Sequence, residues 1–173
     1  PVTRSRFFWE KAIRGLVLYL VPYMIMELML KNWPVNMWIQ TPMDMIHSIV
    51  TKHHPDPDKI ARIEVSPYIP ERSEDSPADG YDSLVAAQFS IPFCMAMYLK
   101  GPKVGTQWLD EKYLKDPEIL KMASKVHGVG ETSLISSNFD TFQQGSYPSY
   151  TMKMVMEDGT VYEEAVQFPK GHP

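Results

Sequence analysis

The stretch from Asp82 to Gly101 constrains the fold most, because it is the longest run in the chain that is both apolar and compatible with a helix. Asp82 and Ser83 offer side-chain oxygens that can accept from the free N–H groups of a first helical turn. Gly101 can end the helix in a left-handed conformation without Cβ strain. Apolar residues fall on nearly all sides of this helix, which is typical of a helix buried in a core. The sequence therefore predicts one long buried helix around which the rest of the chain packs.

Pro92 disturbs this predicted helix. It has no N–H and would crowd the carbonyl of Gln88, which costs roughly 3 kcal/mol in a helix interior. Gln88 and Ser90 are the polar residues in the middle of the run. The pattern predicts a kink, and it leaves two interpretations open for these two residues. They either satisfy the interrupted backbone alone or also bind a ligand.

Composition limits the class of protein. A chain of 173 residues with 44% hydrophobic residues can form one domain with a real core, or one domain and an extra segment. The net charge of -4 with scattered basic residues argues against a nucleic-acid partner. Cys94 is the only cysteine, so one chain can form neither a disulfide nor a cysteine-based metal site. We expect a reducing, cytoplasmic compartment.

The segment Leu16–Leu30 is strongly apolar but is interrupted by Pro22 and Glu27. It is shorter than the roughly 20 residues that a membrane-spanning helix needs, and no small-residue cleavage site follows it. We interpret it as a packing surface and not as a membrane segment, because a large apolar surface is typical of an interface. The chain is thus expected to be part of a larger protein and to form a homo-oligomer. Residues 1–40 would form an apolar and crossing segment, and residues 41–173 an α+β domain.

Local patterns predict the remaining elements. Thr41 can cap a helix with Pro42 at its first position, residues 58–69 alternate as a strand, and Asp158-Gly159 is a strong hairpin signal. The expected helices are 7–20, 41–54, 106–114 and 116–124, and the other expected strands are 125–129, 150–156 and 160–168. Together they predict an α+β fold, an antiparallel sheet of about four strands with helices on one face.

A turn at residues 53–58 contains two adjacent histidines and two aspartates. Neighbouring residues project in different directions and no third set of ligands recurs nearby, so we interpret them as solvated turn residues and predict no metal site.

Four segments, in order, resemble one known family. Residues 26–40 resemble a Lys-x-aromatic-Pro segment that is followed six residues after the proline by His or Gln. Residues 57–65 resemble its Asp-x-Ile-x-x-Ile-x-Val strand, and residues 87–96 its Ala-x-Phe-Ser-x-x-Tyr-x-x-Ala helix. Asp158-Gly159 and the final Lys-Gly-His-Pro resemble its closing hairpin and exit. The set resembles the MmgE/PrpD family, which includes 2-methylcitrate dehydratases, over residues 23–173.

The resemblance implies a fold and an activity. The family combines a large all-α domain with a smaller α+β lid, and this chain resembles the lid and the segment that crosses into it. The helical domain, which carries the family's catalytic Asp and His residues, has no counterpart here, so a helical domain or second subunit is the expected partner. The family's substrates are small di- and tricarboxylates, and no metal or other cofactor is implied. The expected function is the lid part of a metal-independent hydro-lyase for a 2-methylcitrate-like acid.

The resemblance also implies site residues. Lys31 takes the place of the family's active-site lysine, and Gln40 that of its His or Gln, so these two are the expected catalytic residues. The expected substrate-binding residues are Ser90, Phe93, Gln88 and His172. Phe93 stands where the family has Tyr, so the hydroxyl of that Tyr is missing and a standard mechanism is in doubt.

Other interpretations stay open from the residues alone. Lys31 could be a solvated loop residue and Gln40 a cap for the following helix. The chain could also be a non-catalytic interaction module that associates through Leu16–Leu30, or an epimerase or decarboxylase of the same family.

Overall fold

The computed structural model describes residues 31–69, 72, 74–130, 149–166 and 170. They belong to one compact unit that runs from Lys31 to Lys170. The predicted helix 7–20, the apolar segment Leu16–Leu30 and the loop 131–148 lie outside the described residues. The proposed division of the chain at residue 40 stays a prediction.

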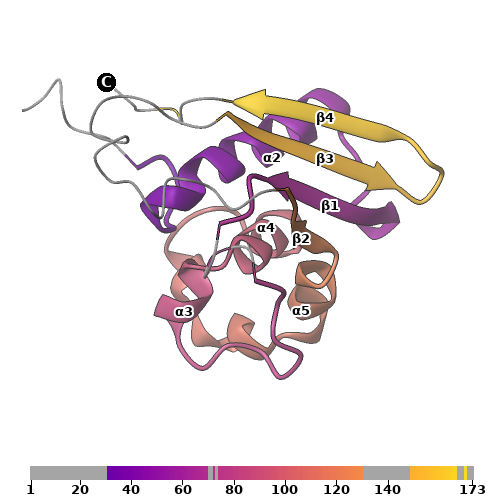
Figure 1. The fold of residues 1–173 in the computed structure, drawn as a ribbon. Coiled ribbons are helices and arrows are strands. Elements are labelled where there is room, and N and C mark those ends of the chain that lie inside the picture. The colour runs from indigo at the N-terminus through magenta and orange to yellow at the C-terminus, as the bar shows by residue number, and fades with distance from the viewer. Residues whose placement is uncertain (1–30, 70–71, 73, 131–148, 167–169, 171–173) are drawn as a thin grey trace, which may run out of the picture. The chain divides into compact units, whose positions relative to one another are not determined.

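A sheet of four strands forms one layer of this unit (Figure 1). The strands are β1 (Ile60–Ser66), β2 (Val126–Gly128), β3 (Tyr150–Met156) and β4 (Val161–Val166). Their order is β2-β1-β3-β4, with β2 parallel to β1 and the other pairs antiparallel. The α+β fold with a mostly antiparallel sheet is therefore confirmed.

Alternation of apolar and polar side chains explains how the sheet lies on the core. In β3, Met152 and Met154 are buried, whereas Thr151 and Lys153, which alternate with them, are exposed. At the end of β3 the carboxylate of Asp158 accepts from the backbone N–H of Thr160 at 2.9 Å, which closes the predicted hairpin turn. One face of the sheet therefore packs against the core, and the other faces solvent.

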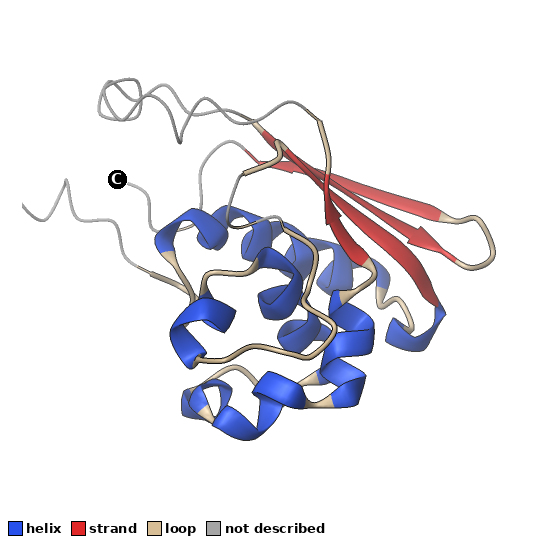
Figure 2. Ribbon diagram, turned by 60° about the horizontal axis from the view of Figure 1, so that its bottom comes forward, coloured by secondary structure: helices blue, strands red, loops and turns tan. Residues whose placement is uncertain are grey.

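Helices cover the apolar face of the sheet (Figure 2). The α-helices are α2 (Gln40–His53), α3 (Leu84–Gln88), α4 (Ile91–Lys100) and α5 (Pro117–Ala123). Short 3-10 helices are η1 (Met37–Ile39), η2 (Pro57–Lys59), η3 (Thr106–Leu109) and η4 (Glu111–Lys115). Helix α2 packs against β3 and β4, and α4 contacts α2, α5 and β2. The buried helix predicted at the centre of the fold is therefore α4.

The prediction of one long helix over residues 82–101 is wrong, because the chain breaks between α3 and α4. Ser90 is the N-cap of α4, and its hydroxyl oxygen accepts from the N–H of Phe93 at 3.3 Å. Pro92 lies in the first turn of α4, where its missing N–H would have had no helical partner. The proline therefore starts a helix instead of kinking one.

The two helices also differ in burial. Residues 91–97 of α4 are all buried, whereas Ala87 is the one buried residue of α3 and Val85 is 65% exposed. Ser83 caps α3 as expected, accepting from the N–H of Ala86. Gly101 ends α4 with extended backbone at φ -79°, so the expected left-handed end is wrong. Glycine is needed there for space, because a Cβ atom would lie 2.5 Å from the carbonyl oxygen of Met97.

Two further helix boundaries differ from the predictions. Helix α2 begins at Gln40 with Ile39 as its N-cap, so Thr41 lies inside the helix and does not cap it. The helix expected at 106–114 is replaced by η3 and η4, which Asp110 separates. Helix α5 is confirmed, since the Asp116 carboxylate caps it by accepting from the N–H groups of Glu118 and Ile119.

Candidate functional site

The segment that begins with Lys31 is fixed by the side chain of Gln40, which is fully buried. The amide oxygen of Gln40 accepts from the N–H groups of Asn32 and Trp33, both at 3.0 Å. Its amide nitrogen donates to the carbonyls of Trp33 at 3.0 Å and Val35 at 3.3 Å. A carboxamide has two donors and two acceptor sites. The Gln40 side chain therefore holds the loop with its whole hydrogen-bonding capacity and is neither a helix cap nor open to a substrate in this structure.

A second anchor for the same loop is Asp44 of α2, whose side chain is buried. One carboxylate oxygen accepts from the indole Nε1–H of Trp33 at 2.8 Å, and the other accepts from the backbone N–H of Lys170 at 2.7 Å. Lys31 itself is exposed and has no hydrogen-bond or ion-pair partner in the described part of the chain. The residues that directly follow Lys31 are therefore anchored, whereas its own ammonium group is exposed to solvent.

The Lys31 loop and the break between α3 and α4 lie next to each other. The backbone N–H of Asn36 donates to the carbonyl of Gln88 at 3.1 Å. The structure therefore brings together two of the segments that carry predicted site residues. His172 lies outside the described residues, and the roles predicted for all six residues stay predictions.

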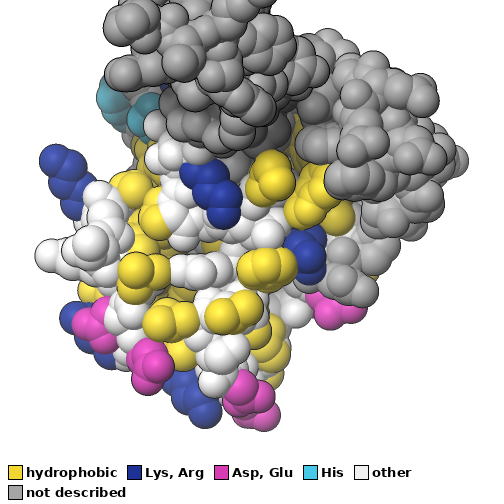
Figure 3. Space-filling model, turned by 90° about the vertical axis from the view of Figure 1, so that its left-hand side faces the viewer, with side chains coloured by type: hydrophobic (Ala, Val, Ile, Leu, Met, Phe, Trp, Pro, Cys, Tyr) yellow, Lys and Arg dark blue, Asp and Glu magenta, His cyan; other side chains and the backbone are white. Residues whose placement is uncertain are grey.

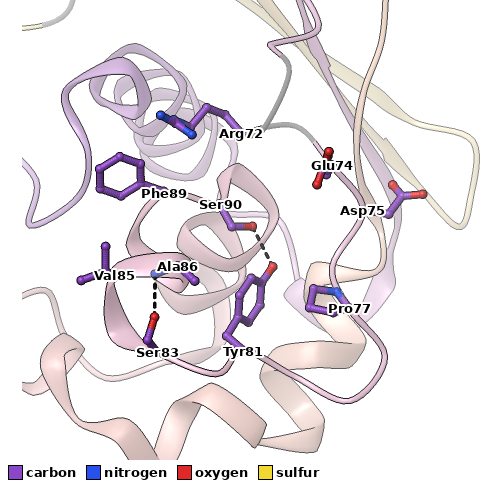
Figure 4. A pocket seen from close by; sticks show the side chains of 10 residues that line it. All are labelled: Arg72, Glu74, Asp75, Pro77, Tyr81, Ser83, Val85, Ala86, Phe89 and Ser90. Atoms are coloured by element: carbon purple, nitrogen blue, oxygen red, sulfur yellow. Dashed lines mark hydrogen bonds between the residues drawn. The ribbon is translucent and has the colours of Figure 1, made fainter.

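A cavity of about 540 Å³ lies beside the α3–α4 break (Figure 4). Its lining residues are Arg72, Glu74, Asp75, Pro77, Tyr81, Ser83, Val85, Ala86, Phe89 and Ser90. Ser90 is the one predicted site residue among them. Phe93 is buried behind this lining, with its ring edge-on to that of Tyr81 at a centroid distance of 5.0 Å.

Tyr81 and Ser90 form a hydroxyl pair at the wall of the cavity. The phenol oxygen of Tyr81 lies 2.7 Å from Oγ of Ser90, and the two side chains point at each other (Figure 4). Burial raises the pKa of the Tyr81 phenol above its ordinary value. The phenol is therefore neutral at physiological pH, which lets it donate a hydrogen bond.

Charged residues complete the cavity. The guanidinium carbon of Arg72 lies 4.5 Å from the centroid of the Phe89 ring, an arrangement that fixes the cation against an aromatic face. Glu74 and Asp75 are exposed, and the Asp75 carboxylate lies 3.0 Å from Nδ1 of His127 on β2. A guanidinium and a pair of hydroxyls are the groups that recognise a carboxylate.

Arg72 and Tyr81 were missed by the sequence analysis, because both lie in or next to a polar loop without periodicity. No local pattern marks either residue as part of a site. The one available signal is that Tyr81 directly precedes the predicted apolar helix 82–101.

The molecular face on the left of Figure 1 is mixed in character. Figure 3 shows hydrophobic side chains spread over its middle, with Lys or Arg side chains among them and acidic side chains toward the lower edge.

Two other features are absent from the described residues. No group of three or more His, Cys, Asp or Glu side chains among these residues could hold a metal ion. Nor does any described helix have the length and apolar character needed to cross a membrane.

Most of the chain matches the model of one known protein family. The model of the MmgE/PrpD C-terminal domain matches residues 33–173, a range that begins just after Lys31. No curated protein matches the sequence. Since the match covers nearly the whole described unit and agrees with its α+β fold, the chain belongs to the MmgE/PrpD family, and its matched part is the C-terminal domain.

Proposed function

We propose that the chain forms the lid part of a metal-independent lyase that eliminates water from a small di- or tricarboxylate similar to 2-methylcitrate. A helical domain, in the same protein or in a second subunit, completes the active site, and the assembly is a cytoplasmic homo-oligomer. Membership of the MmgE/PrpD family supports this proposal. The chemistry of the cavity beside the α3–α4 break supports it independently.

The observation that carries the proposal is the cavity's set of polar groups. Arg72 brings a cation to one wall, and the Tyr81–Ser90 pair brings neutral hydroxyls to another. The hydrogen bond from Asn36 to Gln88 keeps the Lys31 loop against the same helix break. Arg72 and the two hydroxyls suit a substrate carboxylate, because charge-assisted hydrogen bonds give both strength and orientation. Lys31 lies outside the cavity lining and would bind a second carboxylate from the neighbouring loop, whereas the exposed acidic residues Glu74 and Asp75 lie on the lining itself.

These groups can assist the elimination of water. A base removes a proton from the carbon next to a substrate carboxylate, and a hydroxide leaves the neighbouring carbon with its bonding electrons as the double bond forms. Negative charge builds up on the carboxylate, where Lys31 or Arg72 would stabilise it. A neutral phenol such as that of Tyr81 can protonate the leaving hydroxide. The base would come from the helical domain.

Binding of 2-methylcitrate to the 173-residue chain tests the proposal. A ligand that binds only the folded state raises the unfolding midpoint, by the equivalent of about 2.7 kcal/mol when its concentration is 100 times Kd. We expect Lys31→Gln to weaken binding about tenfold, the effect of losing one charge-assisted hydrogen bond. The control Lys153→Gln removes the same charge from the exposed face of β3 and should leave binding unchanged. No stabilisation by 2-methylcitrate, or equal effects of the two variants, would refute the proposal.

A second function, binding without turnover, is favoured by two observations. Gln40 has no free hydrogen-bonding capacity, and Phe93 has no hydroxyl. Supplying the family's helical domain to the chain and following 2-methylcitrate by NMR separates the outcomes. An alkene product indicates the hydro-lyase, carbon dioxide a decarboxylase, an inverted centre an epimerase, and unchanged substrate the binding module.

A further inference from the structure

A second cavity, of about 370 Å³, lies at the opposite end of α4 from Ser90, where Tyr98 and Leu99 belong to the last turn of the helix. Its lining residues are Trp33, His47, Val50, Pro55, Pro57, Tyr98, Leu99, Gly101, Pro102, Lys103 and Val104. None of them lines the first cavity. Most of the lining is apolar, and three of its residues are prolines. The volume lies within the range of small-molecule pockets.

Three rings build one wall of this cavity. The Trp33 ring stands edge-on to His47 at a centroid distance of 5.3 Å and to Tyr98 at 5.5 Å. Nδ1 of His47 lies 2.7 Å from the hydroxyl of Tyr98, which joins α2 to α4. The indole N–H of Trp33 also donates to the Asp44 carboxylate, which fixes the orientation of the ring. The wall is therefore formed before any ligand arrives, which reduces the entropy lost on binding.

Two polar groups on the lining of this cavity have no partner among the described residues. Nδ1 of His47 is engaged by Tyr98, and the other ring nitrogen has no partner in the part of the chain that the structure describes. Lys103 is exposed on the loop after α4, and its ammonium group likewise has no ion-pair partner among the described residues. The cavity thus combines an aromatic and aliphatic interior with one hydrogen-bonding ring and one cation.

We propose that this second cavity binds a small planar aromatic molecule that carries one anionic group, such as an aromatic carboxylate. The aromatic ring packs beside Trp33 and Tyr98, where edge-to-face contacts are favourable. The anion pairs with Lys103, and His47 supplies a hydrogen bond. The two cavities share no lining residue, although Trp33 of the second cavity lies on the same loop as Lys31.

Benzoate is the probe for the 173-residue chain, and benzyl alcohol is its uncharged counterpart. Binding is followed by NMR through the indole N–H resonance of Trp33, which is assigned by its loss in Trp33→Phe. For so small a ligand we expect a Kd on the order of 1 mM for benzoate and a weaker one for benzyl alcohol. A Trp33 resonance that stays unmoved by benzoate overturns the proposal.

Three variants locate the ligand. Val104→Trp places an indole into the cavity from an exposed loop and should abolish the shift of the Trp33 resonance with benzoate. Lys103→Gln should weaken benzoate about threefold, the effect of a partly exposed ion pair, and leave benzyl alcohol unchanged. Lys115→Gln is the control, because it removes the same charge from an exposed position outside the cavity. Undiminished binding by Val104→Trp, or equal benzoate affinities in the two lysine variants, contradicts the assignment.

Discussion

At the scale of single residues, Gln40 shows how one side chain can replace regular structure. The loop from Lys31 to Val35 forms neither helix nor strand, so its buried backbone groups need other partners. Gln40 supplies four hydrogen bonds from within the first turn of α2. The catalytic role that the resemblance implies for this residue remains a prediction, whereas its hold on the loop is seen directly.

Replacing this side chain should therefore destabilise the fold. Gln40→Leu keeps the bulk but leaves buried backbone groups of Trp33 and Val35 without partners, at about 1–3 kcal/mol for each fully buried group. We expect a loss of roughly 2–4 kcal/mol in the free energy of unfolding, measured by urea titration. The control is Gln107→Leu in η3, where the glutamine is exposed and the change should stay within about 0.5 kcal/mol. Equal stability of both variants would contradict the anchoring role.

At the scale of elements, the break between α3 and α4 depends on one proline and one serine. A Ser-x-Pro sequence inside an apolar run is compatible with a kinked helix and with a new N-terminus, because both begin with the same interrupted hydrogen bond. The N–H of Phe93 donates a capping hydrogen bond to the Ser90 hydroxyl, and a separate hydrogen bond joins the hydroxyls of Tyr81 and Ser90. Both favour the new start. Because Tyr81 lies outside residues 82–101, the sequence of that stretch alone could not decide between a kinked helix and a new helix start.

The effect of Pro92→Ala on stability distinguishes the two arrangements. In the interior of a continuous helix the change would stabilise the protein by about 3 kcal/mol. In the first turn of α4 it should instead destabilise by about 1 kcal/mol, because the unfolded chain gains freedom and some buried contact is lost. Pro117→Ala is the matched control, since Pro117 opens α5 at an exposed position and should cost less. Stabilisation by Pro92→Ala, seen as a higher urea midpoint, would contradict the broken helix.

At the scale of the whole molecule, local signals predict elements, whereas contacts between distant segments decide the site. Asp158-Gly159, Asp116-Pro117 and the alternation around β1 each act within a few residues, and the hairpin, α5 and β1 form as predicted. The pairing of His47 with Tyr98 joins residues 51 apart and carries no local signature. The same holds for Arg72 and Tyr81, which a polar loop brings to the first cavity. Sequence patterns therefore predicted the α+β layers and pointed to Ser90 at the first cavity, but they predicted neither the other polar residues of that cavity nor the second cavity.

One such distant contact makes stability depend on pH. The Glu164 carboxylate on β4 accepts from the Ser48 hydroxyl at 2.8 Å and pairs with the Lys52 ammonium at 2.6 Å, which ties the strand to α2. The hydrogen bond from Lys52, followed by that from Ser48, holds the pKa of Glu164 below its ordinary value of 4.5. A carboxylate whose pKa is lower in the folded state stabilises the fold above its unfolded pKa, and this contribution disappears as the pH falls through the folded pKa.

Glu164→Gln should therefore lower the unfolding temperature at neutral pH and have a smaller effect as the pH falls below 4.5 and through the lowered pKa of the native carboxylate. The neighbouring Glu163→Gln serves as the control, because Glu163 on the same strand is 61% exposed and its pair with Lys153 is exposed as well. Exposed pairs of this kind contribute about 0–1 kcal/mol, so its unfolding temperature should follow that of the unmodified chain at every pH. Thermal unfolding of the three proteins across this pH range measures the difference. Parallel curves for Glu164→Gln and Glu163→Gln would show that the tie between α2 and β4 does not set the acid stability of the fold.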